Sequence, residues 1–301
     1  MKQFFVVTVV LLALFATNSC ERVSTRITDR AGREVAFSGT ANRIISTAPS
    51  NTEIIVDLGM ADRLVAVDIN SADIEGIPEG LPRFDPFFPD AEFILALRPD
   101  LIIASGDKPA GSGDDPFRLL ADAGISSVYI PMSYSINDIY LDIAFVADIL
   151  RVQERGAELV EKMKTEIAEI TAFVPRIENR RTVYYEISPP PEMMTMGEGS
   201  FIHDMISVIG AENVFGKDGW LVRPGAEALI ERNPEVILTN VHFVDDPVGE
   251  IKNRLGFNHI NAVINDRVYL IDKDSSARPS ARITLALRQM AQAVYPELYA
   301  R

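Results

Sequence analysis

Short runs of apolar residues alternate along most of the chain with segments in which apolar residues recur every three or four positions. The short runs are largely continuous in apolar character and often β-branched, which is typical of buried parallel strands. They predict strands at residues 43–47, 64–68, 101–104, 128–131, 182–187, 236–239 and 268–271. Because helical segments lie between these strands, the pattern predicts an α/β fold whose sheets are mainly parallel.

Two of the helical segments carry terminal signals of their own. The sequence Ser-Asn-Thr-Glu at 50–53 matches a capping box, which predicts a helix that runs to about Leu58. Ser200 is expected to cap a second helix over residues 201–209. A glycine directly follows each of these segments and predicts its end.

The middle of the chain is different, because residues 136–173 contain almost no helix-breaking residue except Gly156. Ser135 can cap the start of this run. In its second part the apolar positions recur at steps of three or four, which is typical of a helix that buries one face. Two dozen helical residues would span roughly 35 Å, which exceeds a normal crossover helix. We therefore expect a long helix at residues 151–174 that joins two lobes.

A short internal repeat supports two similar halves. Residues 92–103 read EFILALRPDLII and residues 227–238 read EALIERNPEVIL. In each, a glutamate opens a short helix, a proline follows seven positions later, and an acidic residue precedes a buried strand. The repeat places Glu92 and Glu227 at equivalent positions of the two halves. The alternative is a single domain with one long surface helix, since helix–proline–strand units are common in α/β proteins.

Composition and charge exclude some classes of function. The chain has 301 residues, 47% of them hydrophobic, so it can bury a sizeable core. Its formal net charge of -14 argues against binding to nucleic acid or to an anionic lipid surface. A receptor for a bare metal ion would need clustered imidazoles and carboxylates, whereas His203, His242 and His259 are scattered. We therefore expect no nucleic-acid partner and no protein-held metal ion.

The start of the chain predicts export and lipidation. A basic start is followed by an apolar run at residues 4–16, which is too short to span a bilayer comfortably and is typical of a signal peptide. The only cysteine, Cys20, then resembles the lipid-modified first residue of mature bacterial lipoproteins. Thr17 departs from that pattern, in which an aliphatic residue is usual. The alternatives are removal of residues 1–19 with lipid attached to Cys20, or an ordinary signal peptide with an incidental cysteine.

An ordered set of short motifs covers about residues 27–297. It comprises TDRAGREV at 28–35, RIISTAPSNTEII at 43–55, LRPDLII at 97–103, GSFIHDMI at 199–206, RVYL at 267–270 and RPSAR at 278–282. Together these motifs resemble the periplasmic binding proteins for iron–siderophore complexes, cobalamin and heme. Each motif alone is weak, whereas their order is specific for the family and not for a ligand.

The resemblance implies two Rossmann-like α/β lobes joined by a single long helix, with a ligand cleft between them and little hinge closure. With that helix at residues 151–174, the N-terminal lobe would comprise residues 20–150 and the C-terminal lobe residues 175–301. A monomer is expected. The resemblance also implies that one glutamate on each lobe docks onto arginines of the membrane permease of an ABC importer. Glu92 and Glu227 fall at those positions, although acids at helix starts can simply complement the helix dipole.

Ligands of open α/β sheets bind beyond the carboxyl ends of the strands. In this sequence those ends predict the cleft residues Ser50, Ser105, Tyr134, Tyr185, His242 and Arg278. The resemblance adds the loops that precede the two glutamates, and with them the aromatic residues Phe84, Phe87 and Trp220. Such a set suits a flat or apolar ligand, although each aromatic side chain can instead belong to the core. Arg278 can pair with a ligand carboxylate or form a structural salt bridge.

Two other classes of function are weighed against a solute-binding protein. An extracytoplasmic α/β hydrolase needs a nucleophile with a base, but Gly-Glu-Gly-Ser at 197–200 lacks the glycine that completes a nucleophile elbow. A lipoprotein adhesin does not account for the internal repeat or the aromatic loops. We therefore expect no catalytic residues and no cofactor. The expected ligand is a ferric siderophore, a corrinoid or heme.

Overall fold

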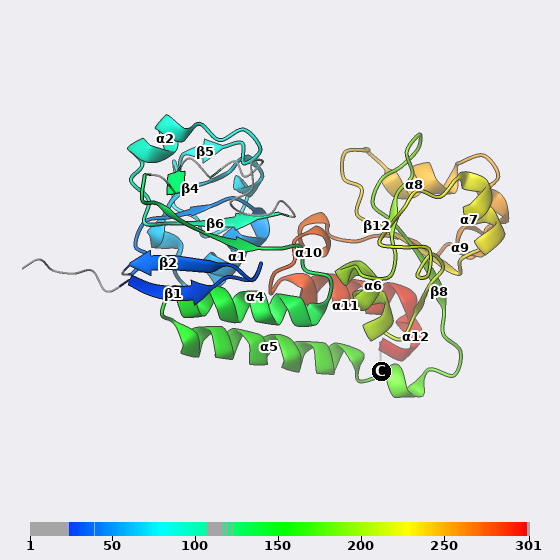
Figure 1. Cartoon of the computed structure of the whole chain (residues 1–301). Coiled ribbons are helices and arrows are strands. Elements are labelled where there is room, and N and C mark those ends of the chain that lie inside the picture. The colour runs from blue at the N-terminus through cyan, green and yellow to red at the C-terminus, as the bar shows by residue number, and fades with distance from the viewer. Residues whose placement is uncertain (1–23, 39, 107–116, 118–119, 122, 300–301) are drawn as a thin grey trace, which may run out of the picture.

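The computed structural model describes residues 24–38, 40–106, 117, 120–121 and 123–299. The predicted signal segment and Cys20 lie outside these ranges. The described chain forms two α/β lobes, each built around a parallel sheet (Figure 1). The first sheet has five strands in the order β5-β4-β3-β6-β7, and the second has four in the order β10-β8-β12-β13.

The strands of the first sheet are β3 (Ile44–Ser46), β4 (Leu64–Asp68), β5 (Arg83–Phe84), β6 (Leu101–Ser105) and β7 (Ser126–Ile130). Those of the second sheet are β8 (Thr182–Glu186), β10 (Glu212–Asn213), β12 (Val236–Thr239) and β13 (Val268–Leu270). Two antiparallel pairs are added, β1 (Ser24–Thr28) with β2 (Glu34–Ser38), and β9 (Thr195–Met196) with β11 (Leu221–Val222). All seven predicted strands are present, so the predicted parallel α/β fold is confirmed.

Among the described residues of the first lobe, the helices between strands include α1 (Pro49–Asp57) and α2 (Ala91–Ala96). The second lobe contains α6 (Phe201–Val208), α7 (Ala226–Arg232), α8 (Pro247–Lys252) and α9 (Asn261–Ile264), and, after its last strand, α10 (Lys273–Ala277), α11 (Ile283–Val294) and α12 (Pro296–Tyr299). At the junction lie α4 (Ile136–Ile149) and α5 (Gln153–Thr171). Short 3-10 turns occur at Ala61–Arg63, Ile69–Ser71, Val174–Arg176 and Phe257–His259.

The two predicted helix starts have different outcomes. Ser200 caps α6 as expected, because its hydroxyl accepts the backbone N–H of His203 at 3.1 Å. The capping box predicted for α1 is wrong, since the helix starts two residues earlier than the box implies, at Pro49, and Ala48 instead of Ser50 is its N-cap. Proline suits a first helical position because its fixed φ is already helical. The acid of the expected box, Glu53, is instead buried inside the molecule.

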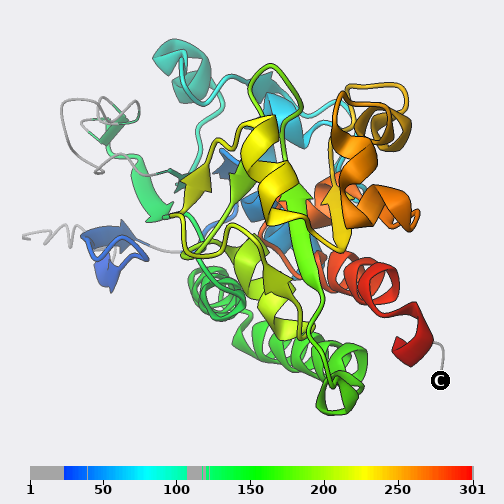
Figure 2. The same cartoon turned by 90° about the vertical axis from the view of Figure 1, so that its right-hand side faces the viewer.

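The breaker-free run in the middle of the chain forms two antiparallel helices that lie side by side (Figures 1 and 2). Ser135 and its capping box begin α4 as predicted. The run is then interrupted at Arg151, whose φ of 59 reverses the chain. Gly156 allows the two helices to approach closely, because a Cβ atom there would collide with Ala147. The expected single connecting helix is therefore not confirmed, since α4 and α5 both lie at the junction.

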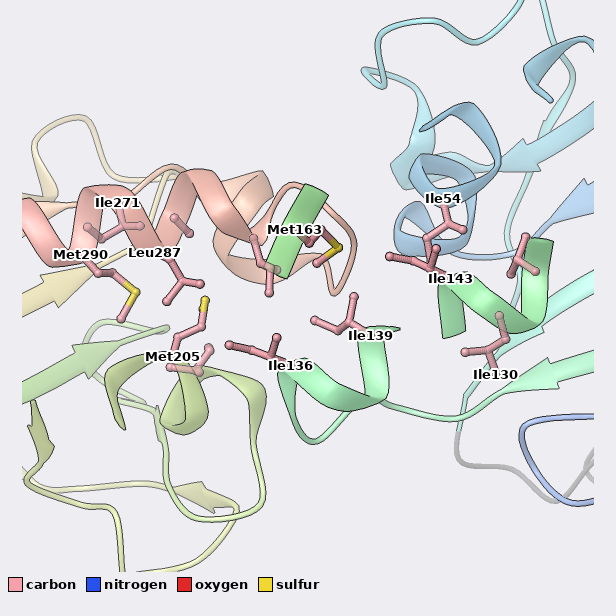
Figure 3. Close-up of a cluster of buried hydrophobic side chains, with 14 of the residues drawn as sticks. Ile54, Ile130, Ile136, Ile139, Ile143, Met163, Met205, Ile271, Leu287 and Met290 are labelled. Atoms are coloured by element: carbon pink, nitrogen blue, oxygen red, sulfur yellow. The ribbon is translucent and has the colours of Figure 1, made fainter. Parts of the chain in front are cut away.

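One hydrophobic core runs through the junction of the lobes (Figure 3). It extends from Ile54 of α1 through Ile139 of α4 and Met163 of α5 to Met205 and Leu287 in the second lobe. All of these side chains are almost fully buried. Because protein interiors are close-packed, rotating one lobe against the other would open gaps in this core. A continuous core therefore favours a cleft of nearly fixed width.

The internal repeat corresponds to equivalent positions in the two sheets. Its strands are β6, which pairs with β3, and β12, which pairs with β8. The acidic residue before each strand accepts a backbone N–H at the start of the neighbouring strand. Asp100 accepts that of Arg43 at 3.0 Å, and Glu235 accepts that of Thr182 at 3.0 Å. The repeat therefore reflects two similarly built halves.

Candidate ligand-binding cleft

A cleft with a volume of about 850 Å³ lies between the lobes and is lined by residues of both. Its walls come from segments that follow β3, β4, β6 and β7 in the first lobe and β8, β12 and β13 in the second. The carboxyl ends of the strands of both parallel sheets therefore face one cavity. Ligand sites of open α/β sheets lie at such strand ends.

The structure brings five of the predicted residues together in the cleft, namely Ser50, Ser105, Trp220, His242 and Arg278. Ser50 lies in the first turn of α1, and Ser105 is the last residue of β6. Trp220 directly precedes β11, and His242 follows β12. These residues come from both lobes, so a ligand in the cleft can touch both at once.

Four predicted residues do not line the cleft, and their assignment to it is not supported. Phe84 is buried in β5, in a separate apolar cluster of the first lobe. Tyr185 is fully buried within β8 and packs in the central core, and this burial raises the pKa of its hydroxyl. Phe87 and Tyr134 are instead exposed to solvent away from the lining.

Several lining residues were not predicted. Ile69 and Asn70 follow β4 directly and Asp73 lies just beyond the next turn, so the rule that placed other residues at strand ends also predicts them. Phe243 follows β12 in the same way. By contrast, Asp142 comes from α4, and no sequence signal distinguishes it from the other acids of that helix.

The exposed part of the cleft lining includes large apolar side chains. Trp220 is 38% exposed, Ile69 50% and Phe243 67%, although all three are large hydrophobic side chains. Exposed apolar surface beside a concavity is typical of a ligand site, because a ligand can cover it and remove it from water.

Arg278 lies where the lobes meet and pairs with carboxylates of both. Its guanidinium is 3.0 Å from Glu53 and 3.0 Å from Asp73 in the first lobe, and 2.9 Å from Asp274 in the second. Ser280 also donates to Glu53, at 2.5 Å. Burial alone would lower the pKa of Arg278, but its hydrogen bonds to Glu53 and Asp73 raise it above the ordinary value. This geometry supports the structural alternative considered for Arg278.

Three further ion pairs contribute to the charges of the cleft wall. Lys273 lies 2.9 Å from Asp274 and 3.4 Å from Asp73, so both carboxylates are shared with Arg278. Asp142 is buried, pairs with Arg30 at 2.6 Å and accepts a hydrogen bond from Ser133 at 2.8 Å. Burial raises the pKa of Asp142, and the bonds from Arg30 and Ser133 only partly offset this.

The part of the chain that the structure describes contains no group of three or more His, Cys, Asp or Glu side chains arranged to hold a metal ion. Among the same residues, every helix is too short or too polar to cross a membrane.

The chain is similar to known binding proteins over most of its length. It is 28% identical to an uncharacterised ABC transporter substrate-binding lipoprotein of Bacillus subtilis, over 91% of this chain and 86% of that protein. It is 29% identical to a vitamin B12-binding protein of Vibrio campbellii, over 85% of this chain and 90% of that protein.

Solved structures share its fold. A possible iron-binding periplasmic solute-binding protein from Staphylococcus epidermidis has 29% identity and a TM-score of 0.75, over 85% of this chain and 100% of that one. A periplasmic heme-binding protein from Roseiflexus has 24% identity and a TM-score of 0.72, over 87% of this chain and 100% of that one. The sequence model of the periplasmic binding proteins matches residues 44–275, and the chain therefore belongs to that family.

Proposed function

We propose that this chain is the solute-binding component of an ABC importer, and that its cleft binds a bulky metal chelate such as a corrinoid, a ferric siderophore or heme. The main support for the proposal is the cleft between the lobes, which has a volume of about 850 Å³ and exposes the apolar side chains of Trp220, Ile69 and Phe243. That volume is near the upper end for small-molecule sites, which favours a large ligand. The relatives named for vitamin B12 and the substrate-binding lipoprotein also support it. Because the family consists of solute-binding proteins, a hydrolase is not supported.

Native mass spectrometry of the purified mature chain against a panel of chelates tests the ligand proposal. The panel contains cyanocobalamin, hemin and a ferric trihydroxamate, each with its metal-free form as the matched control. We expect one chelate to form a one-to-one complex that survives desolvation. If no member of the panel binds, the proposal of a metal-chelate ligand fails.

We further propose that Glu92 and Glu227 dock the permease, one on each lobe. Both are exposed, and each is the second residue of a short helix, α2 or α7. Glu92 is not needed as a cap, because the side chain of Asp90 already accepts the first free N–H groups of α2. Strongly exposed phenylalanines, Phe87 and Phe88, precede α2 and can form the apolar part of an interface.

The change Glu92→Ala with Glu227→Ala tests the docking proposal. A charge at a helix start contributes only about 0.3–1 kcal/mol to folding, so stability and ligand affinity should hardly change. Losing a desolvated glutamate–arginine pair can cost on the order of 2–5 kcal/mol at an interface. Binding of the loaded protein to the permease in nanodiscs should therefore be lost. The control, Glu158→Ala with Glu169→Ala, removes the same charge from exposed positions of α5 and should bind normally.

The lipid anchor is a proposal as well. Cys20 is the only cysteine and follows an apolar segment of signal-peptide length. A relative over 91% of the chain is named a lipoprotein. A diacylglyceryl group on Cys20 would hold the protein at the outer surface of a membrane, near the permease that it serves.

A further inference from the structure

The basic side chains of the cleft wall are already neutralised by carboxylates of the wall itself. Arg278 is only 12% exposed and contacts Glu53, Asp73 and Asp274 at 2.9–3.0 Å. Lys273 contacts Asp73 and Asp274, two of the same three acids. The two positive charges therefore face three carboxylates, and the cluster as a whole is negative.

Asp142, the remaining acid of the cleft lining, is paired as well. It is buried and lies 2.6 Å from Arg30, so the charge of Arg30 is not available to a ligand anion. Among the described residues of the cleft, the Lys, Arg, Asp and Glu side chains thus sum to a net negative charge once their contacting partners are included. A carboxylate that enters the cleft therefore also faces Asp73 and Asp274, whose side chains are 51% and 33% exposed.

Most other polar groups of the lining are hydroxyls and amides, among them those of Ser50, Asn51, Asn70, Ser105 and Asn240. The lining also contains the imidazole of His242. Helices α1 and α6 also begin at the cleft wall and add backbone N–H groups as hydrogen-bond donors. Hydroxyls, amides and N–H groups can form hydrogen bonds with the amide, hydroxyl and hydroxamate oxygens of a ligand. Such hydrogen bonds need no formal charge on either partner.

We infer that the cleft selects a metal chelate that is uncharged or carries a net positive charge, and discriminates against chelates that bear free carboxylates. The inference rests on the proposed function, because it concerns the ligand of the same cleft. Its physical basis is twofold. A ligand carboxylate is repelled by the carboxylates of the cleft wall, and a cation of the wall must give up its protein partner before it can pair with a ligand anion.

Three pairs of ligands, each matched in scaffold and different in charge, test the inference by calorimetry at pH 7 and low ionic strength. The first is cyanocobalamin with its monocarboxylic acid, made by hydrolysis of one side-chain amide. The second is ferrioxamine B, which has a free ammonium group, with its N-succinyl derivative, in which a carboxylate replaces that charge. The third is heme dimethyl ester with heme. In the scaffold that binds, we expect the carboxylate member to bind at least about tenfold more weakly.

A variant identifies the residues that are responsible. Asp73→Asn removes an acid that both cations share, and its side chain is 51% exposed, so the change leaves the core intact. It should reduce the discrimination against the carboxylate member severalfold. The matched control is Asp62→Asn, which removes the same charge from an exposed turn before β4, at the end of the strand away from the cleft. The control should discriminate as the wild type does.

The outcomes separate this inference from the proposed function. Equal or tighter binding of the carboxylate member overturns the inference while the proposed function stands. Discrimination that Asp73→Asn leaves unchanged also overturns it, because the selectivity then has another source. If no scaffold binds in either form, the proposed function fails and the inference fails with it.

Discussion

Replacing Trp220 with alanine should weaken ligand binding by about 2 kcal/mol. Trp220 lines the cleft and is 38% exposed. A tryptophan offers up to about 250 Å² for burial, so a ligand can cover on the order of 95 Å² of this side chain. At roughly 25 cal/mol per Å² of apolar surface, the loss is about 2.4 kcal/mol, or about 50-fold in Kd.

The assay is unusually direct because the chain has one tryptophan. Fluorescence of the wild type therefore reports on the cleft alone, and a bound chelate should quench it. Calorimetry gives the affinities of the wild type, Trp220→Ala and Trp220→Phe, and the phenylalanine variant should retain most of the binding energy. The control is Leu285→Ala, which truncates an exposed apolar side chain of α11 outside the cleft. Unchanged affinity of a folded Trp220→Ala variant would show that Trp220 does not contact the ligand.

Three further predictions concern stability and processing. Glu53→Ala removes a buried carboxylate that joins α1 to Arg278, and should lower the free energy of unfolding in urea by about 3–5 kcal/mol; a loss below about 1 kcal/mol would mean that the pair behaves like a surface ion pair. Labelled fatty acid should enter the wild type and not Cys20→Ser, and equal labelling would contradict lipidation at that residue. Burial alone would raise the pKa of Asp73, but its bonds with Arg278 hold that pKa below its usual value. The Asp73 carboxylate therefore stabilises the fold above about pH 4, and this contribution is lost as the pH falls further. In acid, the free energy of unfolding of the wild type should thus fall more steeply with pH than that of Asp73→Asn, and an equal pH dependence of the two would contradict this.

The sheets could be predicted from the sequence because their strands are buried on both faces. Buried parallel strands read as continuous apolar runs, and those of β6 and β12 are almost wholly enclosed. The start of α6 could be predicted because a local hydrogen bond from Ser200 determines it. The break between α4 and α5 could not, since Arg151 adopts a positive φ in a segment without glycine or proline to signal the turn.

The cleft could be predicted only in part. Topology determines which residues follow the carboxyl end of a strand, and Ser105 and His242, which this rule selects, lie in the lining of the cavity. The direction of a side chain inside a strand depends on packing, which the sequence does not show, and Tyr185 lies in the core instead of the cavity lining. The partners of Arg278 are distant in sequence, because Glu53 lies in the other lobe. Such long-range pairs require the tertiary structure.

ATP-driven uptake into vesicles that contain the permease and its ATPase tests whether this chain delivers its ligand to the importer. The vesicles are supplied with the radiolabelled chelate that the chain binds, and uptake is measured with the wild type, without the protein, and with the double change Glu92→Ala and Glu227→Ala. The account predicts rapid uptake with the wild type alone, and uptake no faster with the variant than without protein, although the variant still binds the chelate. Equal uptake with and without the wild type would contradict the claim that this chain delivers the ligand.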